Sequence, residues 1–297
     1  MVEIKTTGES EGEAGRFKQK DIGIEIDIYS QSNISISSPY ISSKNEININ
    51  GDVINNELRE NLVFKNYVVR AKKLDTSLYR VFNDLELKTG GRFYGAQYQN
   101  LSKNERGRIL IYDKATGECW PTYEYDFKSL HIRLIYDYKD IKIEGSDYYL
   151  LDGIPNGLRN LIKIITNILI NSDRELKARE AIKKALREDG DLNELFETYR
   201  DRRISRVKYI TKIIDAIKKR HKPVEEYFHS GAGLKLQRID SDIAENIFLT
   251  LMEMNIPCLV VHDSFIVPIQ YKNILKQVAE NAYQEVLSFY KSKNFLS

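Results

Sequence analysis

The sequence has few cysteines and no long apolar run, and neither sign of charge is in excess. Its 2 cysteines, Cys119 and Cys258, are too few for a disulfide framework or for a zinc site built on several thiolates. No apolar run approaches the ~18 residues that span a bilayer, and the N-terminus lacks a basic stretch followed by an apolar core. We therefore expect a cytoplasmic protein with no membrane partner.

The charge balance gives no direct sign of a polyanionic partner. Lysine and arginine number 45 against 43 aspartates and glutamates, which leaves a formal charge of +2 on 297 residues. Local clusters of cations must therefore carry any argument for nucleic-acid binding. A hydrophobic content of 42% with 30% charged residues is typical of a globular chain with one large or two small domains.

Residues 259–268 contain the most informative pattern. Two runs of β-forming residues enclose the pair His262-Asp263, and the second run ends in Pro268, which together predict a β-hairpin with the polar pair in its tight turn. We interpret that pair as functional. A carboxylate at the tip of a buried hairpin, with a partner carboxylate on a neighbouring strand, can hold a divalent metal where phosphate chemistry occurs.

Asp126 is the candidate for the partner carboxylate. An alternating strand ends at this residue and a helix-like segment follows, so the side chain is expected at a strand end. A further strand is expected at 106–112, with a turn at 114–117. Glu124 is a rival ligand, because it lies two residues earlier on the same face of the strand.

A long helix is expected from Leu158 to about Leu186. Arg159, Lys163, Asn167 and Asn171 recur every four residues and so share one face of this helix. Two cations and two amides without an acid suit contact with a polyanion such as a triphosphate, although an ordinary exposed face remains an alternative.

Basic residues are concentrated between about 159 and 222, which fits a helical region in contact with a phosphate backbone. Upstream, Gly90 and Gly91 precede Arg92, so the backbone can approach a ligand closely while the guanidinium meets a phosphate or a base edge. A hairpin turn with a surface arginine is the alternative. The nucleic-acid-binding candidates are Arg92, Arg133, Arg174, Lys177, Arg179 and Gln237.

The remaining segments carry less chemistry. Residues 1–56 are interpreted either as edge strands of a small subdomain or as a loosely ordered extension. Helical periodicity is expected at 56–74 and again at 78–85. A further helix is expected to begin with Asp240 or Ser241 as its N-cap, and an amphipathic segment covers 271–290.

In their order along the chain, these motifs resemble the catalytic core of the family A DNA polymerases and their relatives, the single-subunit phage-type RNA polymerases. The resemblance spans residues 89–270 and rests on Gly91-Arg92, the strand ending at Asp126, Arg159-xxx-Lys163, Gln237 and Val261-His262-Asp263. It implies that Asp126 and Asp263 bind two Mg²⁺ ions, with Mn²⁺ as an alternative. It also implies that Arg159 and Lys163 hold the incoming triphosphate, and that Lys163 and His262 join the two aspartates as catalytic residues.

The fold implied by the resemblance is an α+β right-hand polymerase palm. Such a palm has an antiparallel sheet with a catalytic hairpin, a helical fingers insertion and, in this short chain, a reduced or absent thumb. The implied segments are a polar extension or small β subdomain at 1–56, a helical lead-in and first half of the palm at 57–158, basic helical fingers at 159–230, and the second half of the palm with a C-terminal helix at 231–297.

Several departures from the family bear on the choice of sugar. His131 stands where the DNA polymerases carry a glutamate that shields the sugar 2′ position and the phage RNA polymerases a glycine. Asn167 and Asn171 replace large residues near the nascent base pair, and their amides are assigned to nucleotide binding together with His131. Ser264 after the second aspartate resembles the RNA polymerases. The chain is also far shorter than either group, so no exonuclease domain is expected.

The sequence therefore predicts a template-directed nucleotidyltransferase that adds nucleotides to a 3′-OH, with a minimal DNA polymerase of a phage, plasmid or mobile element preferred. The partners are a primed DNA or RNA template and nucleoside triphosphates. The alternatives are an RNA polymerase or primase of the same superfamily, a catalytically inactive nucleic-acid-binding relative, and an α+β hydrolase whose acids pair by coincidence. The primer requirement and the oligomeric state stay open.

Overall fold

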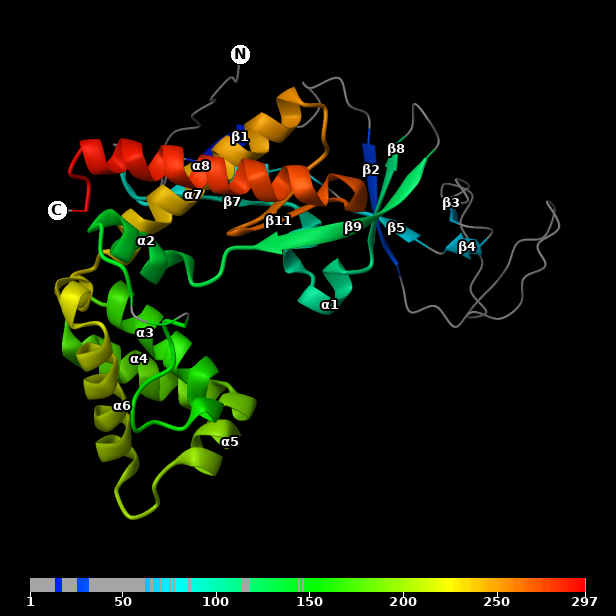
Figure 1. Cartoon of the computed structure of the whole chain (residues 1–297). Coiled ribbons are helices and arrows are strands. Elements are labelled where there is room, and N and C mark those ends of the chain that lie inside the picture. Colours follow the sequence, from blue (N-terminus) through cyan, green and yellow to red (C-terminus); the bar gives the residue numbers. More distant parts are fainter. Residues whose placement is uncertain are drawn as a thin grey trace. The chain divides into compact units, whose positions relative to one another are not determined.

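The computed structural model describes residues 14–17, 26–31, 62–64, 67–69, 71–74, 76, 78–84, 87–113, 118–143, 145 and 147–296 (Figure 1). The protein is α+β, with antiparallel strands and helices, which confirms the expected class. Its contacts divide the chain into two compact units. Unit 1 comprises Met1–Val81, Phe93–Asp126 and Ala244–Ala282, and unit 2 comprises Phe82–Arg92, Phe127–Ile243 and Tyr283–Ser297.

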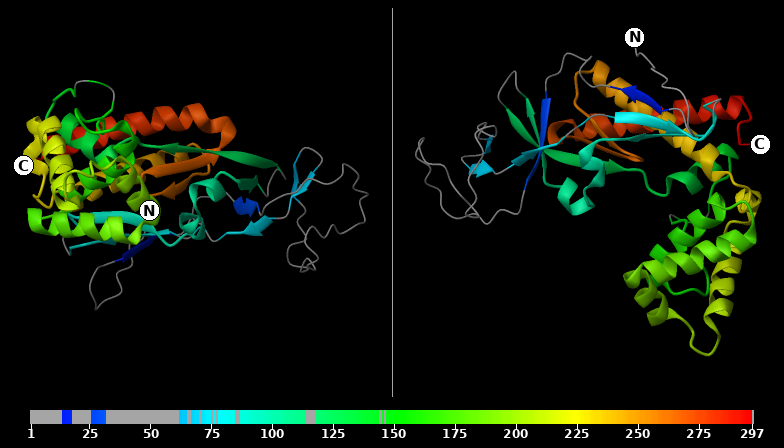
Figure 2. Two further views of the ribbon diagram at one scale, coloured as in Figure 1. Left: turned by 90° about the horizontal axis from the view of Figure 1, so that it is seen from below. Right: turned by 180° about the vertical axis from the view of Figure 1, so that it is seen from behind.

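A six-stranded sheet forms the centre of unit 1, in the order β10-β11-β9-β8-β2-β5. Neighbouring strands are paired antiparallel throughout, and β9 lies beside β11 in both sets of views (Figures 1 and 2). The strands are β2 (Ile26–Gln31), β5 (Ala71–Lys73), β8 (Ile109–Asp113), β9 (Cys119–Asp126), β10 (Leu259–Val261) and β11 (Ser264–Pro268).

The hairpin of β10 and β11 confirms the prediction for residues 259–268. All residues of both strands are buried, as expected for apolar β-forming runs inside a sheet. Val261 pairs with Ser264, so His262 and Asp263 form a two-residue loop. His262 has φ of 55°, the left-handed conformation that tight hairpin loops favour and that costs a residue other than glycine about 1–3 kcal/mol.

Edge strand β10 is covered by the 3₁₀ turn η3 (Gln97–Asn100). The Gln99 amide donates to the Val260 carbonyl at 2.9 Å, and the Val260 N–H donates to the buried Tyr98 hydroxyl at 3.2 Å. An edge strand otherwise presents unpaired backbone groups, so these contacts close the sheet on the side of the hairpin. Next along the chain comes the short helix α1 (Lys103–Arg106), capped reciprocally by Ser102 and Glu105.

Residues 56–82 correct one expectation, because the described parts are strands instead of helix. They are β3 (Leu62–Phe64), β4 (Tyr67–Val69), β5 and β6 (Leu78–Phe82). Valine, phenylalanine and tyrosine dominate these pieces and prefer a pleated backbone, so composition outweighed the helical spacing of the apolar residues. β3 pairs with β4, and β6 joins β1 (Ala14–Phe17) and β7 (Gly90–Tyr94) in the order β1-β6-β7.

The N-terminal segment contributes strands where it is described. β2 lies between β8 and β5, so it is an internal strand of the main sheet and not the edge strand that was expected. The turn expected at 114–117 lies outside the described residues, as does most of the segment 1–56.

Unit 2 is mainly helical, and Figure 2 shows α3 to α6 gathered together. Ile165, Phe196, Ile213 and Ile217 are fully buried in it. Its elements are α2 (Leu130–Tyr138), η4 (Asn156–Leu158), α3 (Arg159–Asn171), α4 (Glu175–Glu188), α5 (Gly190–Tyr199), α6 (Arg206–Arg220) and η5 (Lys222–Tyr227).

The single long helix expected at 158–186 is in fact two helices, α3 and α4. Ser172 and Arg174 have extended backbone angles, and the Ser172 hydroxyl donates to the Ile168 carbonyl. Asn171, Ser172 and Asp173 are three consecutive residues whose side chains compete with the backbone for hydrogen bonds, which explains the interruption.

Two long helices lie in the C-terminal part of the chain. α7 (Gly233–Glu253) begins well before the N-cap expected at Asp240 or Ser241, because Leu236 and Ile239 extend its buried stripe by two turns. α8 (Lys272–Ser292), with the short η6 (Ile269–Tyr271) before it, confirms the amphipathic segment predicted at the C-terminus. Among the described residues, no helix has both the length and the apolar character needed to cross a membrane.

Candidate functional site

Asp126 and Asp263 lie at the same end of the sheet of unit 1. Asp126 is the last residue of β9 and pairs in register with Ser264, the residue directly after Asp263. Opposed Cα atoms of antiparallel strands are about 5 Å apart, so the two carboxylates start from neighbouring backbone positions. The expected pairing of a strand-end aspartate with the hairpin aspartate is therefore realised in the backbone register.

Glu124, the rival ligand, is occupied elsewhere. Arg106 binds both of its oxygens, with Nη2 to Oε1 at 2.7 Å and Nε to Oε2 at 3.2 Å, and both side chains are largely buried. Separating the two side chains is costly, because each would remain a buried charge without a partner. Asp126, by contrast, is 47% exposed, and its ion pair with Lys103 spans 3.6 Å. The geometry thus favours Asp126 over Glu124 as a ligand.

The His262 ring lies beside an aromatic side chain. Tyr94, at the end of β7, meets it edge-on with the ring centroids 5.4 Å apart, and Tyr79 follows at 6.5 Å from Tyr94. The ring contact and the left-handed backbone of His262 fix the residue immediately before Asp263. Backbone strain of this kind is concentrated at functional sites.

The donor set at this edge suits a hard cation. Mg²⁺ is commonly held by one or two carboxylates, with water and substrate phosphates completing its six ligands. Asp126 and Asp263 supply such a pair, and no third acid, histidine or cysteine joins a cluster that could hold a metal among the residues the structure describes. As two hard oxygen donors, the aspartates are of the ligand type that Mg²⁺ takes from proteins.

In unit 2, the polar face of α3 is confirmed, with Leu161, Ile162 and Ile165 buried elsewhere around the helix. Arg159, on the polar face, is not free of acids, because its Nε donates to Asp147 at 2.5 Å and its guanidinium lies over the ring of Tyr149. Burial raises the pKa of the Asp147 carboxyl. Hydrogen bonds from Arg159 and from the Tyr149 amide lower this pKa by a larger amount, so the net shift is downward. Sequence spacing showed no acid on this face because Asp147 comes from the preceding loop.

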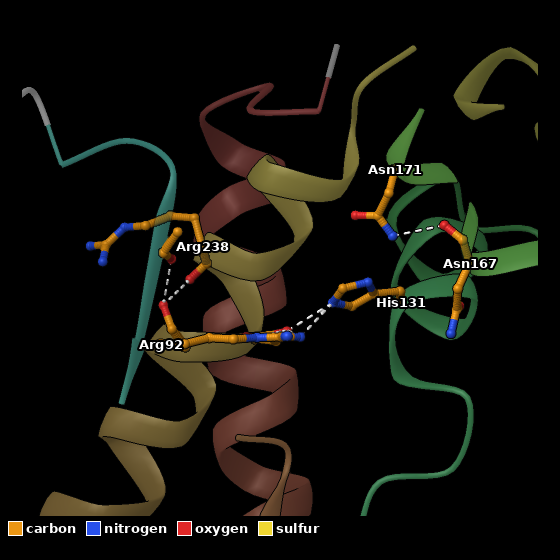
Figure 3. Close-up of polar contacts among 8 residues, drawn as sticks. Arg92, His131, Asn167, Asn171 and Arg238 are labelled. Carbon is orange, nitrogen blue, oxygen red and sulfur yellow. Dashed lines mark hydrogen bonds and ion pairs between the residues drawn. The ribbon is translucent and has the colours of Figure 1, made fainter. Parts of the chain in front are cut away.

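Lys163 is the exposed cation of the α3 face, and no ion pair joins it to another described residue. Asn171, two turns further, donates through Nδ2 to the Asn167 carbonyl at 2.7 Å (Figure 3). Its side chain also packs against Gly233 so closely that a Cβ there would lie 1.8 Å from Oδ1. Lys163 is thus available to a ligand, whereas the Asn171 amide is partly engaged.

His131 belongs to a buried polar cluster in unit 2 (Figure 3). Asp240 on α7 accepts hydrogen bonds from His131 Nε2 at 2.8 Å and from Arg92 Nη2 at 2.5 Å, both on Oδ2. Consecutive left-handed conformations at Gly90 and Gly91, with φ of 78° and 89°, deliver Arg92 to this cluster, and the Gly90 carbonyl accepts from Ser241 on α7. Arg92 is therefore committed to Asp240, which differs from the free guanidinium that we expected.

Comparison of the chain with models of known protein families gives no match, and no curated protein matches it significantly. The functional assignment therefore depends on the residues and contacts above.

The other nucleic-acid candidates differ in how far they are engaged within the chain. Arg133 lies 4.0 Å over the Tyr283 ring and bonds Asp137, while Arg179 bonds Glu175 and Thr211 and so links α4 to α6. Arg174 and Lys177 are exposed beside Asp173. Gln237 is half-buried on α7. The basic region at 159–222 is hence interleaved with acids, which weakens its field on a phosphate backbone.

Sequence reasoning missed Asp240, Asp147, Arg106 and Tyr94. Asp240 was interpreted as a helix cap, yet it lies within α7 and is almost fully buried. A buried carboxylate needs donors, so an aspartate in an apolar helical stripe was a usable signal. Which donors serve it depends on contacts between distant segments, and the sequence alone does not provide these.

Proposed function

We propose that this chain is a template-directed nucleotidyltransferase that adds nucleotides to a 3′-OH by metal-dependent phosphoryl transfer, with DNA synthesis preferred. The observation that carries this proposal is the register of Asp126 opposite Ser264, which brings together the two aspartates that the motif resemblance singled out. The palm interpretation of the sheet belongs to the same proposal. It is supported by the antiparallel order β10-β11-β9 with the polar loop at its end.

Unit 1 would supply the acids of the reaction. Asp126 and Asp263 would hold Mg²⁺, which when bound lowers the pKa of an attacking hydroxyl and neutralises phosphate charge. His262, fixed by its loop and by Tyr94, would orient the hairpin tip. The Arg106–Glu124 pair would keep Glu124 away from the metal, so that the ligand set stays at two carboxylates.

By the motif resemblance, Arg159 and Lys163 of α3 would bind the triphosphate. Lys163 is exposed for this role, and Arg159 is held in place by Asp147 and Tyr149. Cations positioned beforehand stabilise the charge that develops on phosphate oxygens during transfer. Arg174 and Lys177 at the start of α4 would add weaker, salt-dependent contacts to a template backbone.

Two observations bear on the choice between DNA and RNA synthesis. The His131 ring is held on one edge by Asp240, so it would be a rigid neighbour of the sugar if it stands where the resemblance implies. The Asn171 amide, the alternative partner for a ribose 2′-OH, already donates to Asn167. The fixed imidazole favours deoxyribonucleotides, whereas Asn171 keeps one N–H for a partner. RNA polymerase or primase activity remains the second candidate, because Ser264 follows the hairpin aspartate as it does in the phage-type enzymes that the motifs resemble.

Primer extension tests the proposal directly. Three reactions are run in parallel. The first contains a primed DNA template and deoxyribonucleotides, the second the same primed template and ribonucleotides, and the third an unprimed template and ribonucleotides. Extension in the first reaction that depends on Mg²⁺ is the expected result. Product in the third reaction would identify a primase. An absence of product in all three, on DNA and on RNA templates and with Mn²⁺ as well as Mg²⁺, would leave the inactive nucleic-acid-binding relative and the hydrolase as the surviving interpretations.

A further inference from the structure

Asp240 is an unusual residue for the interior of an amphipathic helix. It lies on α7, and its side chain is only 1% exposed. Arg92 donates to it through Nε at 3.2 Å and through Nη2 at 2.5 Å, while His131 contributes Nε2 at 2.8 Å. These donors come from β7 and α2, so one carboxylate joins three segments of unit 2. Since a carboxylate is buried only when it is paired, the cluster is a built arrangement.

The chemistry of the cluster fixes the tautomer of His131. An ionised carboxylate only accepts hydrogen bonds, and the Arg92 guanidinium only donates them. Nε2 of His131 faces both groups (Figure 3), so it must carry a proton to bond Asp240. In the neutral ring the opposite nitrogen, Nδ1, is then unprotonated.

The same contact limits movement of the ring. If His131 rotated away, Oδ2 of Asp240 would lose one of its donors inside a site that water reaches poorly. A free histidine side chain has several accessible rotamers, and this one is held to the rotamer that reaches Asp240.

We propose that Asp240 is the positioning residue that makes His131 an effective discriminator of the nucleotide sugar. This inference rests on the proposed function, in which His131 faces the sugar. The His131 ring excludes a 2′-OH only if displacing the ring costs free energy. Loss of the hydrogen bond to Asp240 is that cost. Discrimination against ribonucleotides therefore depends on two residues, one near the sugar and one behind it.

The test compares incorporation of ribonucleotides and deoxyribonucleotides on one primed template. Asp240→Asn keeps the shape and removes the charge, so we expect the ratio of ribo- to deoxyribonucleotide incorporation to rise about tenfold, equivalent to ~1.4 kcal/mol. His131→Ala should raise the ratio at least as much, and the double variant should show no further gain, since both changes remove one device.

Asp242→Asn is the matched control. Asp242 lies two residues further along α7 and pairs with Arg238 and Tyr290 outside the cluster. It loses the same charge from the same helix, and its incorporation ratio should equal that of the parent. A ratio that rises equally in both aspartate variants would show that general loosening of α7 is responsible, and the proposal would be wrong.

A measurement on the unmodified chain keeps the proposal testable even if Asp240→Asn does not fold. The sequence has 4 histidines, so ¹⁵N spectra of the imidazoles are simple, and His131→Ala assigns the relevant signal by its loss. The Nε2-protonated tautomer is expected for His131 in the parent. The Nδ1-protonated form would overturn the positioning role.

The two levels of the proposal fail in different ways. If the parent incorporates no nucleotide, the proposed function and the claim about sugar discrimination fail together, while the tautomer still shows whether Asp240 positions His131. If the parent is active and His131→Ala changes the incorporation ratio but Asp240→Asn does not, the proposed function stands and only the inference about Asp240 is wrong.

Discussion

Asp126 and Asp240, one in each unit, place the same side chain in opposite environments. Asp126 ends a strand, is about half exposed and meets Lys103 at 3.6 Å. Asp240 is buried and accepts bonds from Arg92 and His131. A carboxylate whose lone pairs are satisfied inside the chain maintains geometry, whereas one that faces solvent with a loose partner can bind a ligand. Substitutions that separate activity from stability test this distinction.

The largest effect is expected at the sheet edge of unit 1. Asp126→Asn and Asp263→Asn should each lower nucleotide incorporation about a thousandfold or more, since an amide is a poor Mg²⁺ ligand and ~4 kcal/mol of transition-state stabilisation would be lost. The free energy of unfolding of Asp126→Asn should change by less than about 1 kcal/mol, because exposed ion pairs contribute little.

Glu124→Gln is the matched control for the aspartate variants. It changes the buried pair with Arg106, so it should lower stability by several kcal/mol at most and leave the metal requirement unaltered. Steady-state extension rates and urea unfolding separate the two cases. An Asp126→Asn variant that extends a primer at the parent rate would show that the register of the two aspartates has no catalytic meaning.

The two cations of α3 allow a second comparison of exposed and engaged groups. Lys163→Ala should lower the turnover rate about a hundredfold with little change in melting temperature, since its charge acts on the transition state. Arg159→Ala should lower both activity and melting temperature, because it also removes the bond to Asp147 and the contact with Tyr149. Parallel kinetics and thermal melts distinguish them, and identical profiles would contradict the division of roles.

The sequence predicted well those features that depend on neighbours in the chain. The β10–β11 hairpin and strand β9 follow from alternating or continuous β-forming residues, and the α3 face follows from a four-residue spacing. These patterns reflect local backbone geometry. The strands at 62–82 were missed because scattered apolar residues fit a helical period by chance.

The sequence could not provide the contacts that give Asp240 its role. Its partners Arg92 and His131 lie 148 and 109 positions away, and the aspartate alone was an equally good N-cap. Asp147 was missed for a related reason, because it reaches Arg159 from outside the helix. Pairing between distant charged groups depends on tertiary packing, which periodicity does not encode.

His221 extends the comparison to a buried neutral group. The Tyr136 hydroxyl bonds His221 Nδ1 at 3.0 Å, and His221 Nε2 donates to the Tyr148 carbonyl at 3.0 Å. Burial lowers the pKa of His221 from 6.5 to about 4. Between pH 6.5 and about 4, His221 is therefore protonated in the unfolded chain and neutral in the folded chain. Stability should fall as the pH falls from about 6.5 to about 4, by up to about 3 kcal/mol in total.

Chemical unfolding of the parent and of His221→Gln at several pH values measures this contribution. The variant is expected to be less stable at pH 7, since it loses packing and hydrogen bonds, but its stability should depend less steeply on pH below 6.5. Equal slopes for the two proteins would mean that other groups cause the acid sensitivity.

The smallest effect is expected from Lys103. This residue lies on the exposed helix α1 and pairs with Asp126 at the end of β9. Its ammonium is a local cation that competes with a metal for the same carboxylate. Lys103→Ala should therefore lower the Mg²⁺ concentration needed for half-maximal incorporation by about two- to fivefold, which corresponds to ~0.4–1 kcal/mol and matches an exposed ion pair. The shift should shrink at high ionic strength, where the pair is screened. Lys103→Arg should behave like the parent, and Asn104→Ala controls for any change to the helix itself.

If Lys103 instead contacts the primer, its removal would raise the primer concentration required and leave the Mg²⁺ dependence unchanged. Titrating Mg²⁺ and primer separately distinguishes these outcomes, because a competing cation and a substrate contact shift different curves.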